Sequence, residues 1–152
     1  MEKFSPDTQY VPVDFDPFVG PAIERTIPTT EAQREVFIAS SMGHEASCAY
    51  NESVSLDLKG TLNEEAMDRA VAELVRRHEA LRGCISADGL RVIITGREDI
   101  RPALVDLSDE TEIEKQHALD AYGEKDMSTP VDLLNGPVLR VALFRLSAQE
   151  HL

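Results

Sequence analysis

The chain has 152 residues, about the length of one domain, and its 42% apolar and 28% charged residues are ordinary for a soluble globular protein. Its formal net charge of −13 argues against nucleic acid and anionic membranes as partners, because both bind basic surfaces. No apolar run approaches the roughly 18 residues that a membrane span needs, so we expect a cytoplasmic protein. The cysteines, Cys48 and Cys84, have no CxxC spacing and are predicted to be reduced and mostly buried.

The first 28 residues combine repeated prolines with interleaved aromatic and aliphatic side chains. The prolines exclude a helix or a central strand, and a flexible linker would contain fewer apolar residues. We therefore predict that residues 1–28 form an extended arm or inter-domain linker that lies on a protein surface. One candidate is the surface of its own domain. A disordered tail is the alternative.

A capping box predicts a helix that begins near Thr30 and ends before Gly43, because Gln33 follows Thr30 at the required spacing. Residues 44–50 are predicted to form a loop. Residues 51–59 alternate between polar and apolar side chains, which is typical of a half-buried strand.

Residues 63–85 carry the clearest pattern in the chain. Asn63 is a plausible N-cap, and Gly83 is predicted to end the helix before a strand begins at Cys84. The predicted core stripe is Met67, Ala70, Val71, Leu74, Val75, His78 and Leu81, which recur at spacings of three and four. This amphipathic helix requires a sheet to pack on.

The rest of the chain alternates between predicted strands and one further helix. Asp88-Gly89 predicts a hairpin between strands 84–86 and 90–95, and a short strand follows at 103–107. Ser108 or Asp109 is the expected cap of a helix that reaches about residue 125 and lies on the outside. After a loop, strand 138–146 is apolar on both faces and should have neighbours on both sides. Residues 147–150 are predicted to turn, and 151–152 to begin another strand. This order predicts an α+β fold in which helices cover a two-layer mixed sheet.

Four stretches in series resemble the condensation domains of nonribosomal peptide synthetases. RRHEALRG at 76–83 is similar to the family's RHExLR signature, and TTEAQREVF at 29–37 to its first motif. Residues 49–75 resemble the strand and helix that follow, and VDLLNGPVLRVALFRLSAQEHL at 131–152 resembles the run ahead of the active site. The prolines and aromatics of 8–27 are similar to the segment before a condensation domain in hybrid polyketide–peptide assembly lines.

The resemblance implies that residues 29–152 are the N-terminal lobe of a condensation domain, half of a chloramphenicol-acetyltransferase-like fold, truncated before the HHxxxDG motif. Such domains form an amide bond between a donor acyl or peptidyl thioester and an acceptor aminoacyl thioester. The implied partners are carrier domains, whose phosphopantetheine arms deliver both substrates, and the C-terminal lobe. The histidines stand at 44, 78, 117 and 151 with no adjacent pair. We therefore expect no catalytic residue and no directly bound cofactor in this chain, and no activity from it alone.

Several polar residues have a structural and a functional interpretation. For His78 we favour a satisfied core residue over a catalyst, and for Arg82 an ion pair with Glu79 or another carboxylate over a substrate contact. Arg140 stands on an apolar strand and should have a structural partner. Gln33 and Arg34 are candidates for contacts on the donor side of the implied tunnel. His151 precedes the implied catalytic pair and is not expected to be catalytic.

Of two other classes of function, a binding module remains open, and a hydrolase or metal enzyme is not supported. A freestanding, noncatalytic module that binds carrier or partner domains is the alternative. A hydrolase or metal enzyme lacks support, because the sequence contains no GxSxG, HExxH or P-loop and no clustered metal ligands. If the last strand has lost its next neighbour, its exposed edge should promote self-association.

Overall fold

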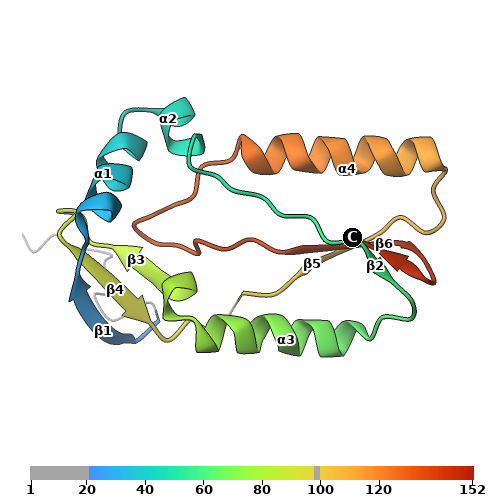
Figure 1. The fold of residues 1–152 in the computed structure, drawn as a ribbon, viewed down its shortest axis with the longest axis horizontal. Coiled ribbons are helices and arrows are strands. Elements are labelled where there is room, and N and C mark those ends of the chain that lie inside the picture. Colours follow the sequence, from blue (N-terminus) through green and yellow to red (C-terminus); the bar gives the residue numbers. More distant parts are fainter. Residues whose placement is uncertain (1–20, 98–99) are drawn as a thin grey trace, which may run out of the picture.

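The computed structural model describes residues 21–97 and 100–152, and its strands form two sheets flanked by helices (Figure 1). The first sheet is antiparallel, with the order β1 (Ile23–Pro28), β4 (Arg91–Thr95), β3 (Gly83–Ile85). The second is mixed, with the order β2 (Leu58–Lys59), β7 (Glu150–His151), β6 (Ala142–Ser147), β5 (Ala103–Asp106). The predicted α+β class is confirmed, although the strands divide between two sheets.

The end of the predicted N-terminal arm is an edge strand of the first sheet. Ile23 pairs with Thr95 and Pro28 with Arg91, so β1 lies antiparallel to β4. Pro28 is tolerated there because an edge strand leaves one row of backbone donors unused. Residues 23–28 are extended and pair with β4 of the same chain, and the arm or linker proposed for residues 1–28 stays a prediction, of which residues 1–20 lie outside the described residues.

The capping box at the first helix is confirmed. In α1 (Glu31–Ser40), the Thr30 hydroxyl accepts a hydrogen bond from the Gln33 backbone N–H at 3.2 Å, and Gln33 Oε1 accepts from the Thr30 N–H at 2.9 Å. The predicted loop after it is wrong, because α2 (His44–Cys48) occupies most of it. A helix of little more than one turn is too short to leave a periodic pattern in the sequence.

The main helix, α3 (Glu64–Arg77), carries the core. Asn63 caps it as predicted, since its Oδ1 accepts from the Ala66 N–H at 2.9 Å. Val71 and Val75 are buried with Ile100, and the residues packed against them are Met67, Leu81, Leu139 and Val141. Leu74 is 45% exposed, so its predicted burial is wrong, because the buried stripe is centred on the two valines.

The helix also ends earlier than predicted. His78 has an extended backbone, with φ −110° and ψ 91°, and a 3₁₀ turn, η1 (Glu79–Arg82), leads into β3. In this turn the Leu81 N–H donates to the His78 carbonyl at 2.9 Å. The break turns the main chain toward β3, and Leu81 stays packed against the core.

The β3–β4 hairpin is confirmed, and it positions α1. The carboxylate of Asp88 accepts from the Ser86 hydroxyl at 2.5 Å and from the Leu90 N–H at 3.0 Å. Gly89 has φ +72°, and a Cβ there would lie 2.9 Å from Phe37 Cδ1. The turn therefore requires glycine both for its backbone conformation and for the close approach of α1.

Two predicted strands are shorter in the structure. Of residues 51–59 only Leu58 and Lys59 form a strand, and Val54 and Leu56 are 85% and 66% exposed. Strand β6 begins at Ala142, not at 138. It lies between β5, to which it is parallel, and β7, so its two neighbours are confirmed. The predicted exposed edge at this strand is therefore wrong, since β2 and β5 form the edges of the sheet as far as the structure describes it.

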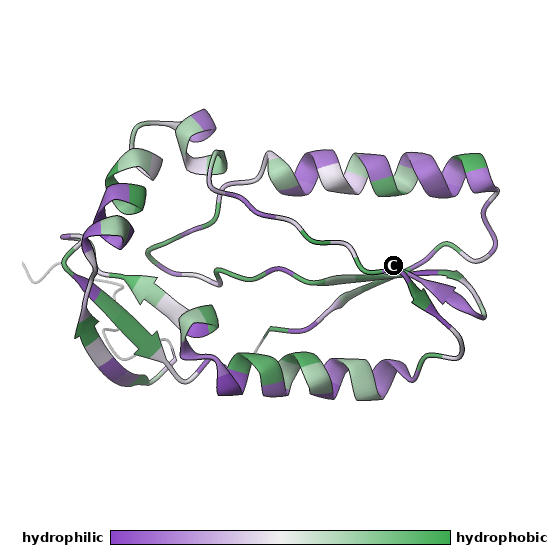
Figure 2. Cartoon of the chain, in the orientation of Figure 1, coloured by the Kyte–Doolittle hydropathy of each residue, from purple (hydrophilic) through white to green (hydrophobic). Residues whose placement is uncertain are grey.

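The last helix, α4 (Glu112–Met127), lies along the opposite side of the molecule from α3 (Figure 1). Its cap is Thr111, not Ser108 or Asp109, because Thr111 and Glu114 complete a capping box. Ser108 instead donates its N–H to the Asp106 carboxylate at 3.0 Å. No residue of α4 is buried, which confirms the predicted outer position, and Figure 2 shows polar residues along most of it.

Candidate functional site

Arg82, in the RRHEALRG stretch, is the most constrained polar side chain among the predicted site residues. It is 9% exposed, and its Nη1 donates to Glu24 Oε2 at 2.5 Å and to the Thr95 carbonyl at 2.6 Å. The Thr95 hydroxyl donates back to the Arg82 carbonyl at 3.1 Å. The predicted ion pair is present, with Glu24 as the carboxylate and not Glu79. It joins the end of η1 to β1 and β4.

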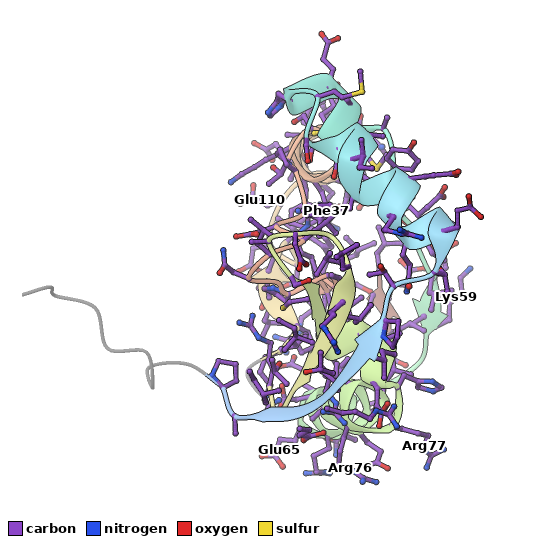
Figure 3. The ribbon with its side chains drawn as sticks, turned by 90° about the vertical axis from the view of Figure 1, so that its left-hand side faces the viewer. Phe37, Lys59, Glu65, Arg76, Arg77 and Glu110 are labelled. Atoms are coloured by element: carbon purple, nitrogen blue, oxygen red, sulfur yellow. The ribbon has the colours of Figure 1, made fainter. Side chains whose placement is uncertain are left out.

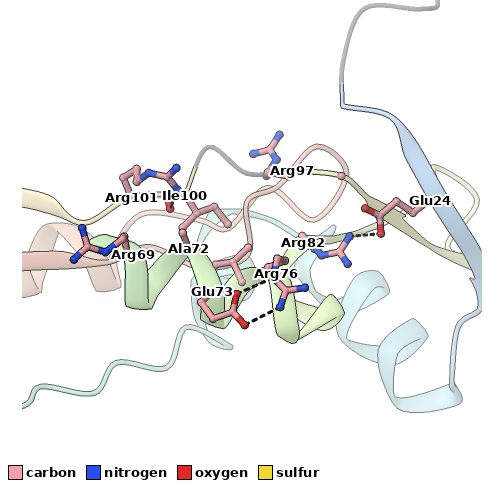
Figure 4. A pocket seen from close by; sticks show the side chains of 11 residues that line it. Glu24, Arg69, Ala72, Glu73, Arg76, Arg82, Arg97, Ile100 and Arg101 are labelled. Carbon is pink, nitrogen blue, oxygen red and sulfur yellow. Dashed lines mark hydrogen bonds and ion pairs between the residues drawn. The ribbon is translucent and has the colours of Figure 1, made fainter. Parts of the chain in front are cut away.

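One donor of this guanidinium is not used within the described part of the chain. Arg82 Nε is buried and has no hydrogen-bond partner among residues 21–97 and 100–152. The side chain lines a pocket of about 270 Å³ that lies between α3, the start of β1 and the residues that follow β4 (Figure 4). A buried donor of this kind is costly unless an acceptor reaches it.

The pocket is rich in arginine, but its cations have anionic neighbours. Glu73 accepts from Arg76 Nε and Nη2 at 2.7 Å each, and Arg101 Nε lies 3.3 Å from Asp68 Oδ2. The hydrogen bond from Arg76 is the main cause that lowers the pKa of the Glu73 carboxyl below its ordinary value. Figure 3 shows Arg76 and Arg77 pointing away from the body of the molecule. These pairs support α3 at its surface.

His78 and Glu79 do not join Arg82. His78 is exposed at the end of α3, so its predicted place in the core is wrong, because the helix breaks at this residue and releases the side chain from the stripe. Glu79 forms an ion pair with Arg25 of β1. The two adjacent pairs, Arg25–Glu79 and Glu24–Arg82, both attach β1 to η1.

Arg140 has the structural partner that was predicted. Its Nε lies 2.7 Å from Asp126 Oδ1, its Nη2 donates to the Asp126 carbonyl at 2.9 Å, and its Nη1 donates to the Thr129 carbonyl at 3.1 Å. The guanidinium therefore satisfies carbonyls at the C-terminal end of α4, where a cation is favoured. It links α4 to the segment before β6.

The predicted donor-side residues lie on α1. Gln33 is used in the capping box, and Arg34 is exposed on the first turns of the helix. His151 is only 5% exposed in β7, and its Nδ1 has no hydrogen-bond partner within the described residues. None of these side chains lines the arginine-rich pocket.

Sequence reasoning missed Glu24 and Thr95, the two partners of Arg82. Glu24 is 58 residues from Arg82 in the sequence, in a segment whose pattern consists of prolines and apolar residues. Thr95 resembles an ordinary strand residue. The expected burial of an arginine next to a strand is the one signal that could have suggested a distant carboxylate.

In residues 21–97 and 100–152, no group of three or more His, Cys, Asp or Glu side chains is placed to hold a metal ion. Among the same residues, no helix has both the length and the apolar character needed to cross a membrane.

Comparisons with known proteins agree on one family. The family model described as the condensation domain matches residues 23–152. One of the linear gramicidin synthase proteins of Brevibacillus parabrevis is 33% identical over 141 residues, which covers 88% of this chain and 3% of that protein. One of the plipastatin synthase proteins of Bacillus subtilis (strain 168) is 29% identical over 129 residues, covering 85% of this chain and 5% of the relative.

Solved structures give the same result for the fold. The starter condensation domain of rhizomide synthetase superposes with a TM-score of 0.72 at 25% identity, over 84% of this chain and 32% of that one. A cyclization-docking bidomain from Sorangium cellulosum has a TM-score of 0.66 at 19% identity, over 87% of this chain and 27% of its own, and is similar in fold. The chain thus spans about a third or less of these structures and a few per cent of the curated relatives.

Proposed function

Because the chain belongs to the condensation-domain family, we propose that it is the N-terminal lobe of a condensation domain in a nonribosomal peptide synthetase. The complete domain forms an amide bond between a donor acyl or peptidyl thioester and the amine of an acceptor aminoacyl thioester. Carrier domains present both substrates on phosphopantetheine arms, and the C-terminal lobe completes the domain. The observation that carries this proposal is the family match over residues 23–152.

In this proposal the chain supplies the scaffold and not the chemistry. Its four histidines are not adjacent in the sequence, so the HHxxxDG motif that the family uses is absent from these 152 residues. Arg82 and Glu24 hold the end of α3 against the first sheet, and Arg140 holds α4. The 152-residue chain is therefore inactive alone, and its residues act by positioning the motif that follows in a longer chain.

The alternative is a noncatalytic module that binds carrier or partner domains. The acidic net charge of −13 and the exposed apolar residues of α1 and the α1–α2 connection, Ile38 and Met42, favour a protein-binding surface. Neither observation selects a partner, so this remains the second candidate.

A loading assay separates the two. The 152-residue chain and a complete condensation domain, made by joining it to the rest of a homologous domain, are each mixed with donor-loaded and acceptor-loaded carrier proteins. We expect an amide product from the complete domain, none from the short chain, and none when the second histidine of the joined motif is replaced by alanine.

Product from the 152 residues alone would overturn the scaffold role. A complete domain that folds with the thermal transition of its homologue but forms no product, while the short chain binds carrier protein, would favour the noncatalytic alternative.

A further inference from the structure

The short helix α2 brings a thiol and an imidazole together. His44 and Cys48 are four residues apart, which places both side chains on one face of this helical turn. Cys48 Sγ lies 3.9 Å from His44 Nε2, and neither side chain has another hydrogen-bond partner among residues 21–97 and 100–152. His44 is exposed and Cys48 is half-buried, so the pair is open to solvent.

The backbone that carries the pair is fixed at its C-terminal end. The Asn51 N–H donates to the Cys48 carbonyl at 3.0 Å. The Asn51 side chain donates through Nδ2 to the Met127 and Thr129 carbonyls at 2.9 Å each. These bonds attach the end of α2 to the end of α4, beside which it lies in Figure 1. A fixed backbone reduces the conformational entropy that the two side chains lose when a ligand joins them.

The local charge favours a cation. Residues 35–58 contain no Lys or Arg, and their acidic residues are Glu35, Glu45, Glu52 and Asp57. The C-terminal end of α4, which Asn51 contacts, is the negative end of that helix dipole. Arg140 also binds this end of α4, but it is paired with Asp126. A positive ion at α2 therefore meets more attraction than repulsion from the residues that these contacts place around it.

The separation of the two atoms is close to that of a metal chelate. Zinc binds sulfur at about 2.3 Å and imidazole nitrogen at about 2.0–2.1 Å, so a tetrahedral angle puts the two ligand atoms about 3.6 Å apart. The 3.9 Å between Cys48 Sγ and His44 Nε2 needs only a small side-chain rotation to reach that value. A thiol is a weak hydrogen-bond donor, so little is lost when a metal replaces this contact.

We propose that His44 and Cys48 form a two-ligand site for a divalent cation of the zinc and cadmium type, with water in the remaining coordination positions. The metal–sulfur bond forms as the S–H bond breaks, the thiol proton goes to solvent, and the neutral imidazole binds through Nε2. Thiolate and imidazole together select such ions over Mg²⁺ and Ca²⁺, which prefer oxygen ligands. This inference rests on the geometry of α2 and is independent of the proposed transferase role.

The test titrates the 152-residue chain with Cd²⁺, followed by the ultraviolet absorption of the cadmium–thiolate bond, and with Zn²⁺, followed by calorimetry. We expect a single ion per chain, and binding that is weaker by about tenfold or more in His44→Ala and in Cys48→Ser. Affinity should rise with pH, because binding releases the thiol proton. The matched controls are His117→Ala, in α4, and Cys84→Ala, at the buried thiol, and both should bind as the unmodified chain does.

Circular dichroism without metal checks that each variant keeps its fold, and His44→Ala leaves both thiols in place. Absence of a cadmium–thiolate band in the unmodified chain would refute the site. Unchanged affinity in His44→Ala would refute it as well, since the ion would then bind a thiol alone, and so would a band that is lost in Cys84→Ala. A dimer that forms in light scattering only when metal is added would place the ion between two copies, against the proposal.

Discussion

Glu24 and Arg82 are joined across 58 residues of sequence by a hydrogen-bonded ion pair of 2.5 Å between Oε2 and Nη1. The two side chains differ in burial, since Arg82 is 9% exposed and Glu24 47%. The arginine also binds the Thr95 carbonyl, so it connects three elements, and its loss leaves a backbone acceptor buried. The pair is therefore asymmetric: more depends on the buried cation than on its half-exposed partner.

This asymmetry predicts that replacing Arg82 lowers the free energy of unfolding more than replacing Glu24 does. Arg82→Met should lower the free energy of unfolding by about 1–3 kcal/mol, because it removes a charged donor from Glu24 and Thr95. Glu24→Gln keeps an acceptor oxygen and should cost less than about 1 kcal/mol. Urea denaturation of both variants measures the difference, and an equal or larger loss for the glutamine variant would contradict it.

The turn at Gly89 predicts a contrast between two glycines. Gly89→Ala places a Cβ 2.9 Å from the Phe37 ring at a φ of +72°, and should cost about 1–3 kcal/mol through strain and overpacking. Gly123 lies in α4 with no neighbouring atom within 4 Å of an added Cβ, so Gly123→Ala should stabilise by about 0.5–1 kcal/mol. Thermal unfolding followed by circular dichroism should show opposite shifts, and a shift of the same sign would contradict the close approach of Phe37.

Local patterns predicted the elements whose cause is local. The capping box at Thr30, the Asn63 cap and the Asp88-Gly89 turn each depend on residues within four positions, and all three are confirmed. The family resemblance, carried by short motifs such as RRHEALRG, is confirmed as well.

Predictions failed where a distant partner decides the outcome. Residues 51–57 alternate like a strand, but alternation does not show whether a neighbouring strand is present to complete the ladder. The break at His78 depends on how α3 must reach β3, and the Glu24 partner of Arg82 comes from an edge strand far away in the sequence. Each of these is a property of tertiary contacts, which a window of residues does not contain.

The two thiols should differ in reactivity. Cys84 is buried beside Gly136, and burial raises the pKa of its thiol above the ordinary value, which lowers the thiolate fraction at neutral pH. Cys48 is only half-buried, in α2. With an aromatic disulfide reagent at pH 8 we expect one fast and one slow reaction. The fast phase should vanish in Cys48→Ser, and its persistence there would show that Cys84 is accessible.

The capping box of α4 makes part of the stability depend on pH. Hydrogen bonds from the Thr111 hydroxyl and N–H hold the pKa of Glu114 below its ordinary value of 4.5. A carboxyl with a lowered pKa in the folded state stabilises the fold above about pH 4.5, and that contribution is lost as the pH falls through the lowered value. Glu114→Gln should therefore have a lower free energy of unfolding than the unmodified chain at pH 7, and the difference between the two should shrink toward pH 3.

The partner in the capping box gives a second variant, because Thr111→Ala should lower the free energy of unfolding by about 1 kcal/mol at pH 7. Glu124→Gln, an exposed change near the other end of the helix, is the control, and an equal pH dependence in that variant would show that general charge, and not the cap, is responsible.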